Sequence, residues 1–350
     1  MAEVELKYGE LNSEALAEAL ANPAEVTALD LSGNNISPSY CIELVDAYVS
    51  KLVNLESLDL KDNKIGPSGA VHLFEALLRH CPKLTYLDVN ENAIQDEALY
   101  TLALLVQSSK LSTLYVVTNH ITPRGLPTLC DGIVASATLT DLSLAFNLLG
   151  DEGARMVAEL LGSHPTLVTL DISDNRISDE GAVAIAAAFI VSNASRLETL
   201  NLSVNQIGDV GFQAIAEALT RAGNAHLTHL DLGCNDTVRD AGRAALARHA
   251  RHIKYVQFID LTSCDLSDED VRQLIAAVES HTSSLTGIEW FNNPRMSLEV
   301  EKQLFTVIEE KTARVAARSD RDAASRLIVA AGVGMALLAV VVAAVVKRRC

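Results

Sequence analysis

The chain has 350 residues, and its 45 acidic side chains outnumber its 28 basic ones, which gives a formal net charge of −17 at pH 7. This charge excludes a general nucleic-acid-binding protein, because contacts to phosphates need basic side chains. Hydrophobic residues make up 49% of the chain but aromatic ones only 4%, so the composition excludes a disordered body and predicts an aliphatic core.

The first predicted element is a short amphipathic helix over residues 12–20. Asn12 supplies a capping side chain at its start, and Asn22 followed by Pro23 ends it. We predict that residues 1–25 form a cap, because a stack of repeated units needs its first apolar face covered.

Ten copies of one phrase follow this cap, over residues 26–305. The phrase is L-x-x-L-x-L-x-x-N-x-I, and its clearest copies begin at Leu55 and Leu167. Successive copies begin 27 to 30 residues apart, a regularity that indicates stacked structural repeats. The ten copies begin at Val26, Leu55, Leu84, Leu111, Leu139, Leu167, Leu197, Leu227, Val256 and Leu285.

Each copy predicts a strand, a turn and a helix. The L-x-L alternation is typical of a short strand with one buried face. The apolar residues that follow the phrase, such as Phe212, Ile215 and Leu219, have helical spacing. The ninth residue is asparagine in nine copies and Cys264 in the other. We predict that this side chain bonds backbone groups at the turn and is structural.

These residues resemble the ribonuclease-inhibitor class of leucine-rich repeats, over roughly Val26 to Phe305. The resemblance implies an α/β fold, a horseshoe-shaped solenoid with a parallel inner sheet and outer helices. It says little about function, because one scaffold serves many partners. It favours a protein that binds other proteins and is not an enzyme.

The concave strand face carries the candidate binding residues. The fifth residue of each copy points away from the buried face, because side chains alternate along a strand, and it is Asp in six copies. This row either attracts a basic partner or is only the usual residue of the repeat class. Aromatic side chains beside it suit a partner's anchor. The predicted partner-binding residues are Tyr86, Asp88, Tyr115, Val117, Asp141, Phe146 and Asp171. A second aromatic group comprises His229, Phe258 and Phe291.

Sequence motifs for a metal, a nucleotide or a catalytic nucleophile are absent. The six cysteines are scattered without a C-x-x-C pair. The close histidine pairs, His226 with His229 and His249 with His252, lack an obvious third ligand. We therefore expect no cofactor and no metal, and we expect the cysteines to be reduced.

The charge reverses toward the C-terminus. Residues 311–350 carry eight basic side chains and two acidic ones, which leaves 20 basic against 43 acidic in residues 1–310. Residues 306–326 are predicted to form a basic juxtamembrane helix or linker. From Leu327 to Val346, 20 consecutive residues lack a charged or strongly polar side chain. A helix of that length is about 30 Å long, so we predict a single transmembrane helix.

The basic stub 347–350 follows this predicted anchor. The arrangement resembles tail-anchored proteins and predicts an integral membrane protein whose repeat domain faces the cytosol. An Ala- and Val-rich span with basic flanks resembles anchors of the mitochondrial outer membrane or the peroxisome more than those of the endoplasmic reticulum. The small residues Gly332 and Ala336 would let two anchors pack as a homodimer. An outward-facing repeat domain is the alternative, and glycosylation at Asn193 would reveal it.

The functional prediction is a membrane-anchored scaffold that binds a cytosolic, basic protein through its concave acidic and aromatic face. The alternative is a regulator of a small GTPase that resembles the Ran GTPase-activating protein, with Arg124 as the nearest candidate for an arginine finger. That resemblance implies an arginine-bearing insertion among the early repeats and a long acidic C-terminal run. This sequence has uninterrupted early repeats and a basic tail.

Overall fold

The computed structural model describes residues 2–191, 196–221, 225–280 and 282–319. Within these residues, eleven strands form one parallel sheet in which neighbours in sequence are also neighbours in space. The strands are β1 (Ala2–Glu5), β2 (Val26–Asp30), β3 (Ser57–Asp59), β4 (Tyr86–Asp88), β5 (Thr113–Tyr115), β6 (Asp141–Ser143), β7 (Thr169–Asp171), β8 (Thr199–Asn201), β9 (His229–Asp231), β10 (Phe258–Asp260) and β11 (Gly287–Glu289).

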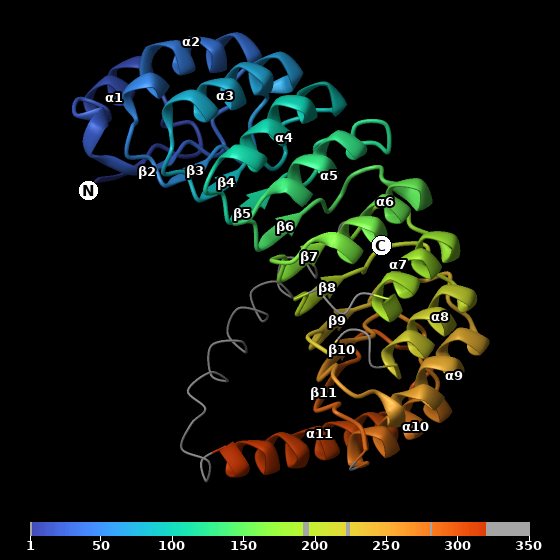
Figure 1. Ribbon diagram of the computed structural model, residues 1–350. Helices are drawn as coiled ribbons and strands as arrows, with labels where there is room; N and C mark the ends of the chain where they lie inside the picture. The colour runs from blue at the N-terminus through green and yellow to red at the C-terminus, as the bar shows by residue number, and fades with distance from the viewer. Residues whose placement is uncertain (1, 192–195, 222–224, 281, 320–350) are drawn as a thin grey trace.

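A helix follows each strand and leads the chain back along the outer side. The helices are α1 (Ser13–Ala19), α2 (Pro38–Tyr48), α3 (Gly66–His80), α4 (Leu99–Ser108), α5 (Leu126–Ala135), α6 (Gly150–Ser163), α7 (Asp179–Val191), α8 (Asp209–Leu219), α9 (Asp240–His249), α10 (Asp268–Glu279) and α11 (Leu298–Ser319). Figure 1 shows the resulting horseshoe, with the strands on its inner side and the helices on its outer side. The predicted α/β solenoid with a parallel inner sheet is therefore confirmed.

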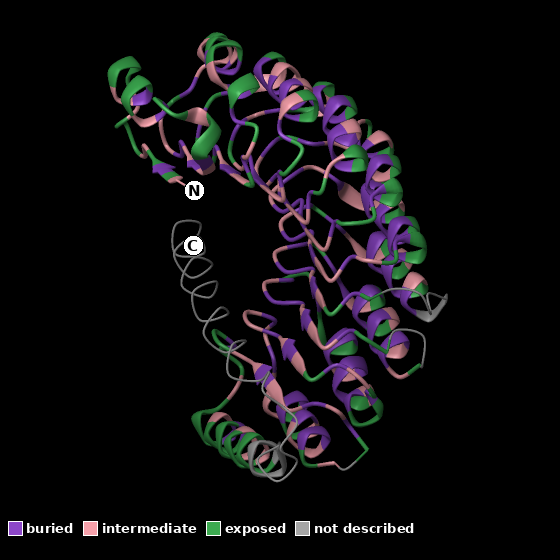
Figure 2. Ribbon diagram, turned by 60° about the vertical axis from the view of Figure 1, so that its left-hand side comes forward, coloured by how far each residue is buried: buried purple, intermediate pink, exposed green. Residues whose placement is uncertain are grey.

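The core lies between the sheet and the helices, where the central apolar residue of each strand stacks on its counterpart in the next. In the middle of the sheet, Leu114, Leu142 and Leu170 are paired in register and are at most 1% exposed. Each such side chain contributes roughly 1.5–3 kcal/mol by leaving water. Figure 2 shows this buried layer as a continuous strip along the horseshoe. The units therefore depend on their neighbours for stability.

The asparagine at the ninth position joins each unit to the unit before it. The Oδ1 of Asn63 accepts hydrogen bonds from two backbone N–H groups of the preceding unit, at 3.0 and 2.9 Å. Its Nδ2 donates to one carbonyl of that unit, at 3.0 Å, and to one of its own, at 2.8 Å. At the ninth unit, the Sγ of Cys264 donates to the carbonyl of Leu232 instead. The predicted structural role of this position is confirmed.

A second polar ladder, which sequence reasoning missed, lies at the starts of the helices. The Oδ1 of Asp151 accepts hydrogen bonds from the N–H groups of Ser178 and Gly181, at 2.8 and 2.9 Å. Asp179 and Asp209 accept two N–H groups each from the following unit in the same way. Glycine is required at position 181, because an added Cβ would lie 2.7 Å from the Asp151 carboxylate. These aspartates satisfy free N–H groups at the helix starts and fix the spacing between units.

Helix α1 and strand β1 close the N-terminal end. Asn12 caps α1 as predicted, because its Oδ1 accepts a hydrogen bond from the N–H of Ala15. Strand β1 pairs in parallel with β2, ahead of the first repeat, and was not predicted. Tyr8, just after β1, lies so close to Gly33 that a Cβ there would clash with its ring. The cap thus covers the first unit with both a strand and a helix.

Helix α11 closes the C-terminal end. It packs on α10, and its Val300 and Leu304 are buried. The Nζ of Lys311 donates hydrogen bonds to the carbonyl groups of Val278 and Ser280 at the end of α10. The last carbonyl groups of a helix have no partner within it, and Lys311 supplies a donor for them. Figure 1 shows α11 running from the last unit toward the open side of the horseshoe.

None of the helices in the described part of the chain is both long and apolar enough to cross a membrane. The predicted anchor 327–346, its small-residue pair Gly332 and Ala336, and the stub 347–350 lie outside the described residues.

Candidate functional site

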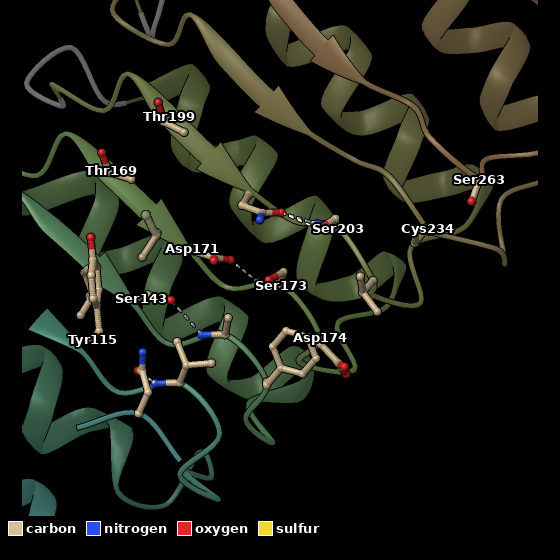
Figure 3. A pocket seen from close by; sticks show the side chains of 18 of the residues that line it. Tyr115, Ser143, Thr169, Asp171, Ser173, Asp174, Thr199, Ser203, Cys234 and Ser263 are labelled. Atoms are coloured by element: carbon tan, nitrogen blue, oxygen red, sulfur yellow. Dashed lines mark hydrogen bonds between the residues drawn. The ribbon is translucent and has the colours of Figure 1, made fainter. Parts of the chain in front are cut away.

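A groove with a volume of about 840 Å³ follows the concave side of the sheet from β5 toward β11. We call it the concave groove. Its lining comes from the inward-facing strand residues and from the turns that follow them, as Figure 3 shows. The side chains that line it include Tyr115, Val117, Phe146, Thr169, Asp171, Asp174, Thr199, Val204, Cys234, Asp236, Ser263 and Asp265.

The apolar part of the concave groove is built from β5 and from the turns after β5, β6 and β8. Tyr115, Val117, Phe146 and Val204 form it, and each is half-buried. The ring of Tyr86 on β4 packs edge-on against Tyr115, with a centroid separation of 5.7 Å and an interplanar angle of 86°. This geometry is favourable for aromatic pairs and holds Tyr115 in place. Burial raises the pKa of Tyr115, so its hydroxyl stays protonated and can donate a hydrogen bond.

The backbone conformation of the turn places three of these lining residues. φ is +54° for Phe146 and +56° for both Val204 and Cys234. A left-handed conformation costs roughly 1–2 kcal/mol for a residue with a side chain, and it is rare for β-branched residues such as Val204. The eighth residue of the phrase is left-handed in every unit, at Gly33, Asp62, Glu91, Thr118, Phe146, Asp174, Val204, Cys234, Ser263 and Asn292. The turn therefore imposes this conformation, whichever residue occupies the position.

The aspartates at the fifth position accept hydrogen bonds from backbone N–H groups of their own unit. The Oδ1 of Asp171 accepts a hydrogen bond from the N–H of Ser173 at 2.9 Å, and Asp231 does the same with Gly233 at 2.8 Å. Asn201 makes the equivalent bond with its amide oxygen. In each of these three turns, the side-chain oxygen bonds the N–H group two residues later in the chain. The repetition of Asp along the sheet thus has a structural cause.

Burial also makes this row less charged than the sequence suggests. It raises the pKa of Asp88, which is 6% exposed, to about 6. Burial, together with the neighbouring carboxylate of Asp260, raises the pKa of Asp231 to about 7. The pKa of Asp171 is raised by burial too. A carboxylate removed from water without a cationic partner holds its proton more tightly.

We expect Asp231→Asn to raise the free energy of unfolding by about 1–2 kcal/mol at pH 8. The amide keeps the acceptor for Gly233, as Asn201 does on β8, and removes a charge beside Asp260. Because the folded-state pKa is raised to about 7, the folded protein binds more protons than the unfolded chain between about pH 4 and 7. Stability from this group is therefore lost as the pH rises through that window.

Denaturant unfolding at a series of pH values measures this effect. The advantage of the variant should grow from about pH 4 to about pH 7 and stay constant above. The reverse substitution on the adjacent strand, Asn201→Asp, is the matched control and should destabilise the protein over the same window. An Asp231→Asn variant that is less stable than the parent at pH 8 would contradict the prediction.

The structure brings together four of the seven predicted binding residues. Tyr115, Val117, Phe146 and Asp171 line the concave groove. Tyr86 supports it through its contact with Tyr115. Asp88 is buried, and its carboxylate accepts the N–H of Asn90, so its place in the predicted surface is wrong. Asp141 lies outside the lining and accepts a hydrogen bond from the hydroxyl of Thr140.

Sequence reasoning missed Thr169, Thr199, Val204 and Cys234, which also line the concave groove. The signal for two of them was available, because Val204 and Cys234 occupy the same eighth position as Phe146.

The second aromatic group is divided. The rings of His229 and Phe258 lie 5.9 Å apart, and an added Cβ at Gly287 would clash with the Phe258 ring. Phe291 stacks on Trp290 at 6.2 Å and is 63% exposed. These side chains therefore pack along the strands rather than forming a single anchor.

Arg124 is exposed between β5 and α5 and is not part of the groove lining. Within residues 2–319, leaving out the undescribed gaps, no group of three or more His, Cys, Asp or Glu side chains is arranged to hold a metal ion.

Comparison with known families identifies the repeated unit. Seven segments match the family model described as "Leucine Rich repeat", namely residues 26–39, 51–74, 80–103, 135–158, 163–186, 195–216 and 223–247. The units around β5, β10 and β11 have the same strand-and-helix form without a match. Among curated proteins, no sequence matches the chain.

Three solved structures are similar to this chain, and the first of them, with a TM-score above 0.5, shows the same fold. The leucine-rich-repeat-containing protein LegL7 from Legionella pneumophila is 19% identical, with 88% of this chain and 98% of that chain covered and a TM-score of 0.57. An internalin, InlF, from Listeria monocytogenes is 20% identical over 86% and 84% of the two chains, with a TM-score of 0.48. A chain of the Rad7 and Elc1 complex in yeast is 16% identical over 85% and 78%, with a TM-score of 0.49.

Proposed function

We propose, on the premise that this chain is a leucine-rich-repeat protein, that its concave groove binds another protein. Scaffolds of this fold generally act by protein–protein interaction and have no catalytic constellation of their own. The partner we propose presents an apolar segment with basic residues beside it, and the association is a recognition event without chemistry.

The observation that carries this proposal is the apolar wall inside the concave groove. Tyr115, Phe146 and Val204 are half-buried side chains on a rigid backbone, so little side-chain entropy is lost when a partner covers them. Apolar anchors surrounded by polar residues have the anatomy of a binding hot spot.

The charge around this wall supports a basic partner. Asp171, Asp174 and Asp236 line the concave groove, and its described lining contains no Lys or Arg. A fourth carboxylate in the lining, that of Asp265, is already paired with Arg295. Because burial raises the pKa of Asp171, the exposed carboxylate of Asp236 contributes more of the field. Such a field raises the association rate more than the affinity, and salt screens it.

We expect the double variant Tyr115→Ala, Val204→Lys to weaken partner binding at least tenfold, because it removes an anchor and puts a charge into the apolar wall. Proximity labelling from the full-length protein first identifies the partners, and titration of a purified partner then measures the affinity. The matched control is Val210→Lys on α8, where the valine is 61% exposed on the outer side. Equal affinities for the double variant and the parent would contradict the proposal.

We also propose that residues 327–346 anchor the repeat domain in a membrane. The support is the sequence itself, 20 apolar residues between Arg326 and Lys347. Insertion scales assign roughly 3 kcal/mol to each Lys placed near the centre of a span. Two lysine substitutions near the centre of the segment should therefore prevent its insertion into a membrane.

We expect the parent protein to stay in the membrane fraction during alkaline carbonate extraction. The double variant Leu337→Lys, Val341→Lys should be released from that fraction. The control places the same two charges at apolar, exposed positions of α11, with Leu298→Lys and Phe305→Lys. Release of the parent, or retention of the span variant, would count against an anchor. Protease protection in intact vesicles would then report which side the repeat domain faces.

A further inference from the structure

Helix α11 delivers the end of the chain to the open side of the horseshoe. It has 22 residues and is therefore about 33 Å long. It starts beside the concave groove, because Asn292 and Pro294, just before it, belong to the groove lining. Figure 1 shows its other end beyond the strands, on the open side of the horseshoe. Whatever follows Ser319 thus begins on the side where the groove opens.

The following segment is long enough to return to the groove. Residues 320–326 span up to about 25 Å when extended. The 20 residues 327–346 add about 30 Å if helical, so the segment can reach about 55 Å from Ser319. Neighbouring strands lie about 4.8 Å apart, so Val204, just after β8, lies about 15 Å along the sheet from β11 and at most about 50 Å from Ser319. Reach therefore allows contact within one molecule.

The chemistry of the two surfaces is complementary. Residues 327–346 are apolar throughout, and Arg326, Lys347, Arg348 and Arg349 bracket them. The concave groove has an apolar wall and four carboxylates, of which that of Asp265 is paired with Arg295, and its described lining has no Lys or Arg. Burying an apolar side chain is favourable by roughly 0.8 kcal/mol per CH₂ group. Outside a bilayer, the segment is therefore stabilised by covering any apolar surface.

We propose that, away from a bilayer, residues 327–346 occupy the concave groove of their own chain and leave it when the span enters a membrane. The apolar residues of the segment cover Tyr115, Phe146 and Val204, and Arg326, its basic flank nearer to α11, lies against Asp236. This inference rests on the groove as the binding site proposed above. It makes the segment a competitor of the partner, so that binding and membrane insertion are coupled through one surface.

The test uses the full-length chain, produced by cell-free translation without membranes, with a photoreactive benzophenone side chain in place of Thr199. Thr199 lines the concave groove on β8. We expect an intramolecular cross-link to a peptide within residues 327–346. The yield should be at least fivefold higher than from the same probe in place of Val210 on the outer side. Phospholipid vesicles added during translation should reduce the yield at least fivefold.

Two further variants keep the test sharp. Leu337→Lys, Val341→Lys should abolish the cross-link by changing only the segment and not the horseshoe. Val204→Lys, which changes the groove and not the segment, should also lower the cross-linking yield. An unchanged unfolding midpoint of this variant would show that the horseshoe is intact. Equal yields from both probe positions, cross-links only between two molecules, or insensitivity to vesicles would each overturn the inference. If partner binding still depends on Tyr115 in those cases, the inference fails and the proposed function stands.

Discussion

Asn205→Ala is expected to lower the free energy of unfolding by about 3–5 kcal/mol, because this buried amide satisfies several backbone groups at once. Its Oδ1 accepts hydrogen bonds from the N–H groups of Asn175 and Ile177, each at 3.0 Å. Its Nδ2 donates to the carbonyl groups of Ile172 and Leu202, at 3.2 and 3.0 Å. Alanine would leave the two N–H groups and the carbonyl of Ile172 buried without a partner, since the side chain is only 4% exposed, while the carbonyl of Leu202 keeps its bond from the Nδ2 of Asn235.

Two measurements separate this effect from a general loosening of the fold. Urea denaturation gives the change in stability, and amide hydrogen exchange should speed up most at Asn175 and Ile177. The control is Asn54→Ala, whose exposed amide bonds the carbonyl of Ala24, and it should change stability by less than about 1 kcal/mol. A loss below about 1 kcal/mol for Asn205→Ala would show that water satisfies the freed groups.

The fold could be predicted from sequence because one short phrase encodes it ten times. Its leucines alternate at the period of a strand, and its asparagine can only be buried if its hydrogen bonds are satisfied by neighbouring units. Strand β1 could not be predicted in this way, because its four residues, Ala2 to Glu5, carry one apolar core residue, Val4, and no copy of the phrase. Its place depends on pairing with β2, which is a contact between segments and not a local preference.

The candidate site was predicted only in part, because the sequence does not show how deeply each side chain is buried. Strand alternation states which face a side chain points to but not how far neighbours cover it, and so Asp88 was assigned to the surface although it is buried. The position of Val204 in the repeat was readable from the sequence, but its left-handed conformation was not, because a β-branched residue is not expected to adopt it. The position of the turn is set by hydrogen bonds between units, at Val204 through its N–H to the carbonyl of Gly233. Those bonds are visible only in three dimensions.

The eighth unit contains a buried charge at a position that is apolar elsewhere. The residue after the helix-start glycine is Ala154, Ala182 and Phe212 in three earlier units, and all three are fully buried. In this unit it is Arg243, which is 3% exposed. One extra residue precedes α9 here, so the turn is one residue longer than in the preceding unit. The Nη1 of Arg243 donates to the carbonyl groups of Val238 and Cys264, at 3.0 and 3.3 Å.

Arg243→Met is expected to lower the free energy of unfolding by about 3 kcal/mol. Replacing a whole buried ion pair by apolar residues is often neutral, but two of the partners of Arg243 are backbone carbonyls that no substitution removes. The methionine also leaves the carboxylate of Asp240, which now binds the Nη2 of Arg243, with Arg295 alone. The loss of satisfied acceptors therefore outweighs the gain from an apolar side chain in the core.

A matched control distinguishes burial from charge. Arg243 also lies 3.6 Å from the carboxylate of Asp265, and Arg295 binds the same two carboxylates, Asp240 and Asp265, from an exposed position. Arg295→Met should cost less than about 1 kcal/mol, because an exposed ion pair contributes little. Thermal and urea unfolding of both variants measure the difference, and Arg243→Lys should fall between them because one ammonium cannot reproduce the planar fork. An Arg243→Met variant as stable as the parent would mean that the longer turn closes over its own carbonyl groups once the guanidinium is gone.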